Sequence, residues 1–487
     1  MNVEKEYKKI LIILFLVILF NFNLLPINYP TDIYNILEIG FAEYAKQWFA
    51  PAGRLVGLIL FFVLDKTIIS VNMYIVIMKF LSIIISSISI YIFYKTLIQL
   101  DKDASKLKKN IYLLASAATL LNRSTYQFFY YTESAIMWLG VLFVILALKN
   151  LVQNEKKYLR TSIYLFIAMN CYQAVILFYL PVAIILVGVK ANTIKKFFVD
   201  IIKNGIIVLI NLLLGYGILK ILTFYYNAKA FRSTEFVLTF DLILNNFYYI
   251  YSVFCDGAHN LNLSYIYTTI IVLSLFLSPN ILNLNKRVSI LSIWLAITIS
   301  MLEVVGIIST INFYCGDRIQ FAYVSMVGVS LVYFLLYLNT DKEKAINILI
   351  LIFTIIYLAF NIWNANDITK WHRIVRERDE NILNTINLKV AEYEKLQGIE
   401  ITRVEYCYDK NYVRCDYDIR ETKESTQRIL ASEWVVENAI KYTLDSEVVV
   451  EENLEIYSTV FQEKEWDTFN IDEQIKFKEN IMYYCIY

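Results

Sequence analysis

Charged residues are scarce in this chain of 487 residues, since Lys, Arg, Asp and Glu together make up only 18% of it. Hydrophobic residues make up 58% and aromatic residues 16%. These fractions exclude the usual mixture of a water-soluble globular protein. The composition therefore predicts an integral membrane protein.

Histidines are few, and phosphate-binding loops are absent from the sequence. His259 and His372 are the only histidines, and they do not form a zinc motif. No Gly-rich phosphate loop or P-loop is present, which argues against a nucleotide-driven pump and against a cytoplasmic enzyme that uses nucleotide sugars. The net charge of +1 gives no reason to expect a nucleic-acid partner.

Charge is distributed unevenly along the chain. Residues 364–487 contain 16 Lys and Arg against 26 Asp and Glu, whereas residues 1–363 contain 29 against 18. A basic membrane part is what the positive-inside rule produces, and an acidic tail with Trp and Tyr is typical of a soluble domain. We therefore predict a transmembrane domain at 1–363 and a small α+β extracytoplasmic domain at 364–487.

Apolar runs of about 17 to 25 residues are long enough to cross a bilayer as helices. Residues 160–190 form a longer run, which we interpret as two short helices that meet near "NCYQ". With a shorter run at 110–124 the sequence predicts an all-α polytopic protein with about eleven crossings. The other runs lie at 10–27, 71–98, 134–151, 205–225, 264–282, 288–310, 319–338 and 345–363.

Lys and Arg in the short loops all fall on one face if the N-terminus is cytoplasmic. The first run, which has no small-x-small cleavage pattern after it, is then an uncleaved signal anchor in the cell membrane. On this count Arg54 to Thr67 lies along or dips into the outer interface. The loops at 30–55, 123–133, 227–262 and 312–318, together with the tail, would lie outside.

The first outer loop, "PTDIYNILEIGFAEYAKQWFAPAGRL", has an aromatic and aliphatic helical face. A helix with this face would lie flat among the lipid headgroups. Thr31 is its expected N-cap, and Pro51 with Gly53 would end it. Asp32 would then lie at the membrane surface, where an isolated aspartate also has the simpler role of favouring the helix dipole. The face consists of Ile33, Tyr34, Leu37, Phe41, Tyr44 and Trp48.

Three short motifs resemble those of known membrane enzymes: "TDIYN" followed by "WFAPAGR", "NCYQAVILFYLP", and the outer "CGDRIQF". Together with the signal anchor and the outward tail, they resemble the GT-C superfamily, and the chain is most similar to the Gtr type II glucosyltransferases that decorate bacterial O-antigen. The resemblance covers about residues 1–365. It implies transfer of a hexose, such as glucose, from a polyprenyl-phosphate carrier to an extracytoplasmic glycan acceptor by an inverting mechanism.

Such a reaction needs a carboxylate near the acceptor hydroxyl and positive charge near the departing phosphate. Asp32 is the candidate base, and Arg54 and Arg318 are candidate phosphate ligands. Arg54 has the alternative of extending along the lipid interface, and Arg318 that of pairing with Asp317.

Other side chains are candidates for substrate binding. Tyr172 and Gln173 would face a cavity at a helix junction, or else satisfy backbone groups there. Arg123 and Glu133 would line the sugar site or pair with each other. These assignments do not depend on a metal.

Where the family often has two adjacent acidic residues, this chain has Thr31 and Asp32, and Glu38 and Glu43 are the candidates for the missing charge. On a straight helix Glu43 would lie about 16 Å from Asp32, too far to share a proton. No set of metal ligands is assigned. The alternative that Asp32 and a distant loop residue bind a divalent cation stays open. Glu303, within an apolar run, is a costly carboxylate that is either functional or paired with a neighbouring arginine.

Two other functions compete with a transferase. A polysaccharide polymerase would be expected to place essential arginines in later outer loops. A flippase or transporter of lipid-linked sugars would be expected to show an internal repeat, and the chain has none of fixed period.

In the tail, strands are predicted at 399–408, 412–419 and 446–450, with a helix near 425–444. Cys407 and Cys415 could face each other as a disulfide across a hairpin.

Overall fold

The computed structural model describes residues 3–25, 30–67, 69–153, 158–228, 241, 244–245, 287–310, 317–337, 344–410, 428–444, 447–466 and 468–487. It is mostly helical with a small sheet near the C-terminus, which confirms the predicted class in outline. The chain forms two compact units. The first comprises Met1–Phe22, Ala45–Lys66 and Val76–Asn366, and the second comprises Asn23–Tyr44, Thr67–Ile75 and Asp367–Tyr487.

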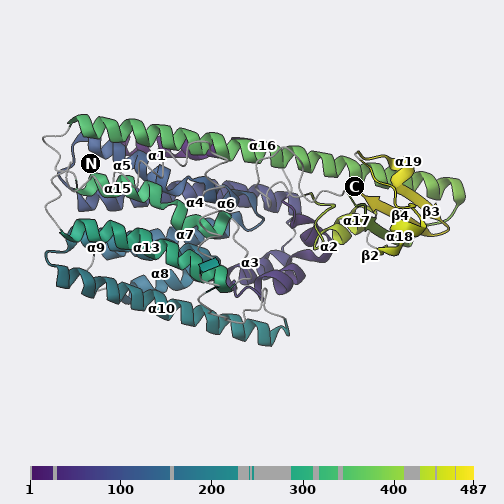
Figure 1. Cartoon of the computed structure of the whole chain (residues 1–487), viewed down its shortest axis with the longest axis horizontal. Helices are drawn as coiled ribbons and strands as arrows, with labels where there is room; N and C mark the ends of the chain where they lie inside the picture. The colour runs from purple at the N-terminus through teal and green to yellow at the C-terminus, as the bar shows by residue number, and fades with distance from the viewer. Residues whose placement is uncertain are drawn as a thin grey trace. The chain divides into compact units, whose positions relative to one another are not determined.

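The first unit is a bundle of helices that pack side by side (Figure 1). α7 packs on α8, α8 on α10, α9 on α13, and α5 on α15. Its longer helices are α1 (Val3–Phe20), α3 (Leu55–Asp65), α4 (Val71–Leu100), α5 (Lys106–Leu120), α7 (Ser134–Gln153), α8 (Tyr158–Cys171), α9 (Tyr179–Lys190), α10 (Ile194–Tyr225), α13 (Arg287–Thr310), α15 (Met326–Tyr337) and the first part of α16 (Lys344–Gln397). Its short elements are η2 (Ala45–Phe49), η3 (Arg123–Thr125), α6 (Gln127–Tyr130), η4 (Gln173–Phe178), η5 (Asp317–Gln320) and α14 (Phe321–Val324).

Six helices of the described residues are long and apolar enough to cross a membrane, and each coincides with a predicted crossing. They are Val71–Leu100, Ser134–Gln153, Gln173–Lys190, Ile194–Tyr225, Arg318–Tyr337 and Lys344–Gln397. The predicted break near "NCYQ" is confirmed, because α8 ends at Cys171 and η4 begins at Gln173.

The total of eleven crossings stays a prediction. α1, α5, α8 and α13 are helices at four other predicted crossings, whereas 264–282 lies outside the described residues. The stretch assigned to the outer interface forms the 11-residue helix α3.

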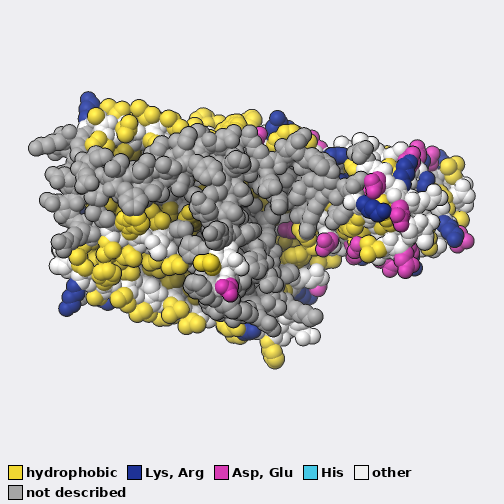
Figure 2. Space-filling view, in the orientation of Figure 1, with side chains coloured by type: hydrophobic (Ala, Val, Ile, Leu, Met, Phe, Trp, Pro, Cys, Tyr) yellow, Lys and Arg dark blue, Asp and Glu magenta, His cyan; other side chains and the backbone are white. Residues whose placement is uncertain are grey.

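α10 shows how the bundle presents its surface. Large apolar side chains are exposed along it, for example Leu213 at 62% and Phe224 at 89%. Figure 2 shows this hydrophobic surface over α10. Its inner face carries polar side chains that form hydrogen bonds within the bundle, since the Tyr179 hydroxyl donates to Asn204 at 2.6 Å and Asn211 donates to Ser162 at 3.0 Å. An apolar exterior of this extent is expected of a helix that faces lipid.

The second unit contains a four-stranded sheet of order β2-β1-β4-β3. β1 (Arg403–Tyr408) is parallel to both β2 (Val449–Glu452) and β4 (Ile481–Ile486), and β3 (Ile475–Lys478) is antiparallel to β4. The predicted strands at 399–408 and 446–450 therefore exist, and α17 (Val436–Leu444) lies within the predicted helix. The predicted strand at 412–419 lies outside the described residues. Two short helices, α18 (Glu455–Thr459) and α19 (Ile471–Gln474), complete the unit.

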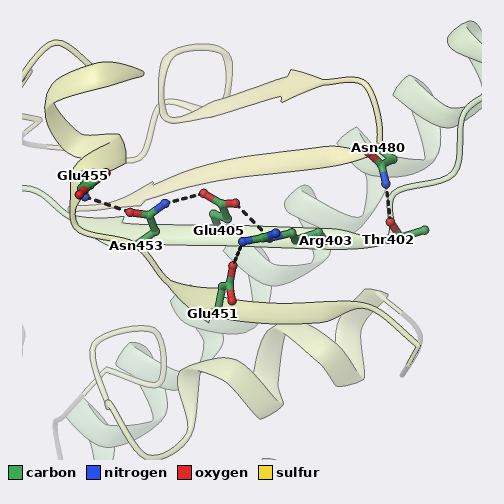
Figure 3. A network of polar contacts seen from close by, with 7 residues as sticks. All are labelled: Thr402, Arg403, Glu405, Glu451, Asn453, Glu455 and Asn480. Carbon is green, nitrogen blue, oxygen red and sulfur yellow. Dashed lines mark hydrogen bonds and ion pairs between the residues drawn. The ribbon is translucent and has the colours of Figure 1, made fainter.

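Polar side chains cross-link the sheet near β1 (Figure 3). Arg403 pairs with Glu405 on its own strand at 3.0 Å and with Glu451 on β2. Asn453 donates to Glu405 at 2.7 Å, and Asn480 donates to Thr402 at 2.7 Å. The contacts of Arg403 with Glu451 and of Asn453 with Glu405 favour the observed register of β1 beside β2.

The first-loop helix α2 (Ile33–Tyr44) does not present its aromatic face to headgroups as predicted. Ile33, Tyr34, Phe41 and Tyr44 are all buried within the protein. Tyr34 meets Tyr442 of α17 edge-on, with ring centroids 6.2 Å apart. The helix is amphipathic as predicted, but other parts of the protein cover its apolar face. Leu37 and Trp48, which complete the predicted face, are partly exposed.

Cys407 and Cys485 stand opposite each other on β1 and β4. Both are buried and neither is in a disulfide. Cys415, the predicted partner of Cys407, lies outside the described residues. The disulfide between Cys407 and Cys415 stays a prediction.

Candidate functional site

Asp32 lies in a turn directly before α2 in the second unit. The Ile33 amide donates to the Pro30 carbonyl at 3.0 Å, and the Asn35 amide donates to the Asp32 carbonyl at 3.2 Å. The helix begins at Ile33, so the residue just before it is Asp32 rather than the predicted cap Thr31. The Asp32 side chain is partly exposed.

Trp434 lies beside Asp32, although 402 positions separate the two residues. Its indole N–H donates to the Asp32 carboxylate at 3.1 Å, and 39% of its surface is exposed. No local sequence pattern predicted this pairing, because Trp434 belongs to the tail. The site thus combines an accessible carboxylate with an accessible aromatic ring.

Two further contacts fix the position of the Asp32 turn. Asn438 of α17 donates to the side chain of the buried Asn35 at 2.7 Å. Arg376 of α16 donates to the Thr31 hydroxyl at 2.5 Å. Asp32 is therefore held between two anchored neighbours, which limits its conformational freedom.

Buried charges lie beneath this turn. The Arg376 and Asp379 side chains are 1% and 0% exposed, and their charged atoms lie 3.9 Å apart. Arg428 approaches the same carboxylate at 3.5 Å, and the Ile429 amide donates to it at 2.5 Å. Removing one charged side chain from such a buried group leaves the remaining charges buried without a compensating partner, which is strongly destabilising. Sequence periodicity missed this network, because Arg376 and Asp379 lie on α16 among many other charged residues and Arg428 lies about 50 positions away.

The other carboxylates of the first loop are Glu38 and Glu43. Burial raises the pKa of Glu38 above its ordinary value, and the positive charge of nearby Lys441 offsets only part of that rise. α2 is kinked at Gly40, where φ is 78° and ψ is 170°. The separation of about 16 Å predicted for Asp32 and Glu43 assumed a straight helix, so it does not apply. Glu43 is partly exposed.

Arg54 lies in a separate cluster, within the first unit. Its guanidinium pairs with Glu133 at 2.9 Å, and both side chains are mostly buried, at 18% and 7% exposed. The same guanidinium lies 4.8 Å from the centre of the Tyr172 ring. Glu133 thus pairs with Arg54, whereas the sequence had suggested Arg123.

The remaining candidates belong to the same unit. Gln173 donates to the Ala52 carbonyl at 2.5 Å, two residues before Arg54. The Arg318 guanidinium lies 4.1 Å from the centre of the Tyr131 ring. The backbone amide of Arg318 donates to the side-chain oxygen of Gln127 at 3.1 Å. η3, which contains Arg123, packs against η5, which contains Arg318.

Four segments predicted to lie outside therefore converge: the loop at 50–54, the segment 123–133, the junction at 172–173 and the start of η5. We call this group the arginine cluster, defined by Arg54, Arg123, Arg318, Glu133, Tyr172 and Gln173. It lies in the first unit, whereas Asp32 and Glu43 lie in the second.

Among the described residues, no group of three or more His, Cys, Asp or Glu side chains could hold a metal ion. The suggested divalent cation stays untested. Glu303 of α13 has one carboxylate oxygen that is buried without a hydrogen-bond partner in the part of the chain that the structure describes.

No protein-family model matches this chain, and a search of curated proteins finds no match.

Proposed function

We propose that this protein is an integral-membrane glycosyltransferase that moves a hexose from a polyprenyl-phosphate carrier to a cell-surface glycan outside the cytoplasm. The observation that carries the proposal is the contact between Asp32 and Trp434. An accessible carboxylate next to an accessible indole suits a sugar, because the ring can cover the apolar face of a pyranose while the carboxylate accepts a hydroxyl proton.

Asp32 acts as the general base in this proposal. It takes the proton of the acceptor hydroxyl as that oxygen attacks the anomeric carbon of the donor. The bond from the anomeric carbon to the phosphate oxygen breaks, and its electron pair stays on the lipid phosphate. A single displacement of this kind inverts the anomeric configuration.

The arginine cluster, within the first unit, is the candidate binding site for the phosphate of the lipid carrier. Arg54 shares its charge with Glu133, but its Nε is a buried donor without a hydrogen-bond partner among the described residues. In this proposal a side-chain rearrangement on donor binding lets that N–H donate to a phosphate oxygen. Arg318, stacked on Tyr131, adds a second guanidinium to the same cluster. Guanidinium groups suit this role, because they bind phosphate oxygens through a fixed fork of donors.

The extended apolar surface of α10 supports access to a lipid-linked donor, because the carrier must reach the site from the bilayer. A polymerase or a flippase would share that surface. Neither accounts for the carboxylate beside an exposed tryptophan, which is why a transferase is preferred.

The experiment uses membranes that contain the full chain, supplied with synthetic polyprenyl-phosphate glucose, polyprenyl-diphosphate glucose or nucleotide glucose, together with candidate glycans. We expect transfer from polyprenyl-phosphate glucose alone, with an inverted linkage in the product. Elongation that uses only diphosphate-linked sugars would indicate the polymerase instead. Movement of the donor across vesicles without transfer would indicate the flippase.

A further inference from the structure

A groove of about 480 Å³ runs along α16 in the second unit. One wall is a stripe of the helix formed by Ile374, Arg378, Asn381 and Thr385, and the other wall contains Phe469 and Tyr487. Its volume lies within the range of about 300 to 1,000 Å³ that is usual for small-ligand sites. None of these residues belongs to the proposed catalytic groups.

The spacing of the stripe explains why the groove is open. Positions 374, 378, 381 and 385 follow one face of a helix. Val375, Asp379 and Ile386 follow another face and are fully buried in the unit. α16 therefore uses one side for packing and leaves the other side accessible.

The opposite wall is held in place before any ligand arrives. Arg378 donates to the Tyr487 hydroxyl at 2.5 Å, and the Arg428 guanidinium lies 4.6 Å from the centre of the Tyr487 ring. Arg428 also donates to the Tyr487 main-chain oxygen. The Phe469 ring stands nearly parallel to Tyr487, with a 26° interplanar angle and 6.5 Å between centroids. A preorganised wall lowers the entropic cost of binding.

The chemistry of the lining selects a class of ligand. Asn381 and Thr385 each offer a donor and an acceptor, while Glu377 and Arg378 also line the groove and carry opposite charges. An acyl chain would leave these polar groups without partners, which is costly. An anion would meet Glu377 as well as Arg378. A neutral hexose satisfies both kinds of lining, because its hydroxyls can bond to the polar groups and its ring faces can contact the aromatic and aliphatic side chains.

We propose that this groove binds a neutral hexose segment of the acceptor glycan, remote from the hydroxyl that reacts. This assignment rests on the proposed function, since it supplies the acceptor-binding surface of the same enzyme. It also predicts that the enzyme requires an oligosaccharide acceptor, because a monosaccharide could not occupy the groove and the site beside Asp32 at the same time.

The test uses the purified full chain in lipid nanodiscs and measures binding by titration calorimetry. The neutral probes are maltoheptaose, a mannan oligomer and a galactan oligomer, and the acidic probe is an oligogalacturonate of similar length. Asn381→Ala removes two hydrogen-bonding groups from the groove. Asn384→Ala is the matched control, because Asn384 is an exposed asparagine of the same helix that does not line the groove.

We expect at least one neutral oligomer to bind, and Asn381→Ala to weaken that binding about fivefold or more, whereas Asn384→Ala binds as wild type. Thr385→Trp, which fills the groove, should abolish binding while the thermal unfolding midpoint stays near that of wild type. Equal binding by Asn381→Ala and wild type, absence of binding by every neutral oligomer, or tighter binding of the oligogalacturonate would overturn the proposal.

Transfer from polyprenyl-phosphate glucose is measured on the same variants to separate this proposal from the proposed function. If oligomers bind through Asn381 but no transfer occurs, the groove is retained and the transferase is rejected. If transfer occurs and Asn381→Ala leaves both the affinity and the acceptor KM unchanged, the transferase is retained and the groove is rejected.

Discussion

The two units differ in which side chains they expose and which they bury. In the first unit, α10 exposes leucines, isoleucines and aromatic rings such as Leu213 and Phe224. In the second unit, charges cover much of the visible surface (Figure 2), while Arg376, Asp379 and Arg428 are buried. The comparison shows that the surrounding solvent, lipid or water, decides which side chains can face outward. It also predicts that the same substitution will have different effects in the two units.

The largest effect on stability is expected at the Arg54–Glu133 pair of the first unit. Arg54→Met would leave the mostly buried Glu133 carboxylate without its partner, at a cost of about 3 kcal/mol in the free energy of unfolding. The double variant Arg54→Met, Glu133→Gln removes both charges and should recover a large part of that loss. Unfolding in detergent micelles measures both values. A single variant as stable as wild type would show that the pair contributes nothing.

Exposed leucines test the comparison directly. Leu213 in α10 is 62% exposed, and Leu454 in the second unit is 70% exposed. Leu213→Lys should disfavour membrane insertion by about 2.5 kcal/mol, because it places an ammonium in the hydrocarbon region. Leu454→Lys should change stability by less than about 0.5 kcal/mol. The fraction of inserted protein and the unfolding midpoint are the measurements, and equal effects at the two sites would contradict the assignment of solvents.

Trp434 tests the proposed sugar contact of the second unit. Trp434→Ala should raise the KM for the acceptor about tenfold, which corresponds to about 1.4 kcal/mol, because the platform for the sugar ring is lost. Trp434→Phe keeps an aromatic face and should stay closer to wild type. Initial rates at a saturating donor concentration give both values. A KM for Trp434→Ala equal to that of wild type would remove the indole from the acceptor site.

The smallest effect is expected where α2 meets α17. The hydrogen bond from Asn438 to Asn35 should give a coupling energy of about 1 kcal/mol in a double-mutant cycle of the two alanine variants. Unfolding of the four proteins under one condition measures it. Additive losses would mean that this contact does not hold the Asp32 turn.

Much of the first unit could be predicted from sequence, because a long apolar run has few alternatives to a membrane helix. The residues of the arginine cluster were selected from the sequence because charges beside aromatic residues are conspicuous between such runs, and the structure brings them together. The specific pairing of Glu133 with Arg54 was missed, because these residues lie 79 positions apart and no local pattern connects them.

The second unit was harder to predict for the same reason. The periodicity of α2 predicted an apolar face correctly, but it carried no information about whether lipid or α17 would cover that face. β3 was missed because a charged four-residue strand, "IKFK", becomes recognisable only beside its partner. β4 was missed because a short apolar run such as "IMYYCI" is compatible with a buried helix as well as with a strand. The contact of Trp434 with Asp32 likewise depends on tertiary structure alone.

The central claim is that Asp32 is the base of a glycosyl transfer. Its most direct test is the kcat of Asp32→Asn with polyprenyl-phosphate glucose and a transferable glycan, compared with Glu433→Gln, which removes a neighbouring exposed carboxylate. We predict a loss of about 10²- to 10⁴-fold for Asp32→Asn, with donor binding retained and Glu433→Gln near wild type. A kcat for Asp32→Asn within a fewfold of wild type would contradict the claim.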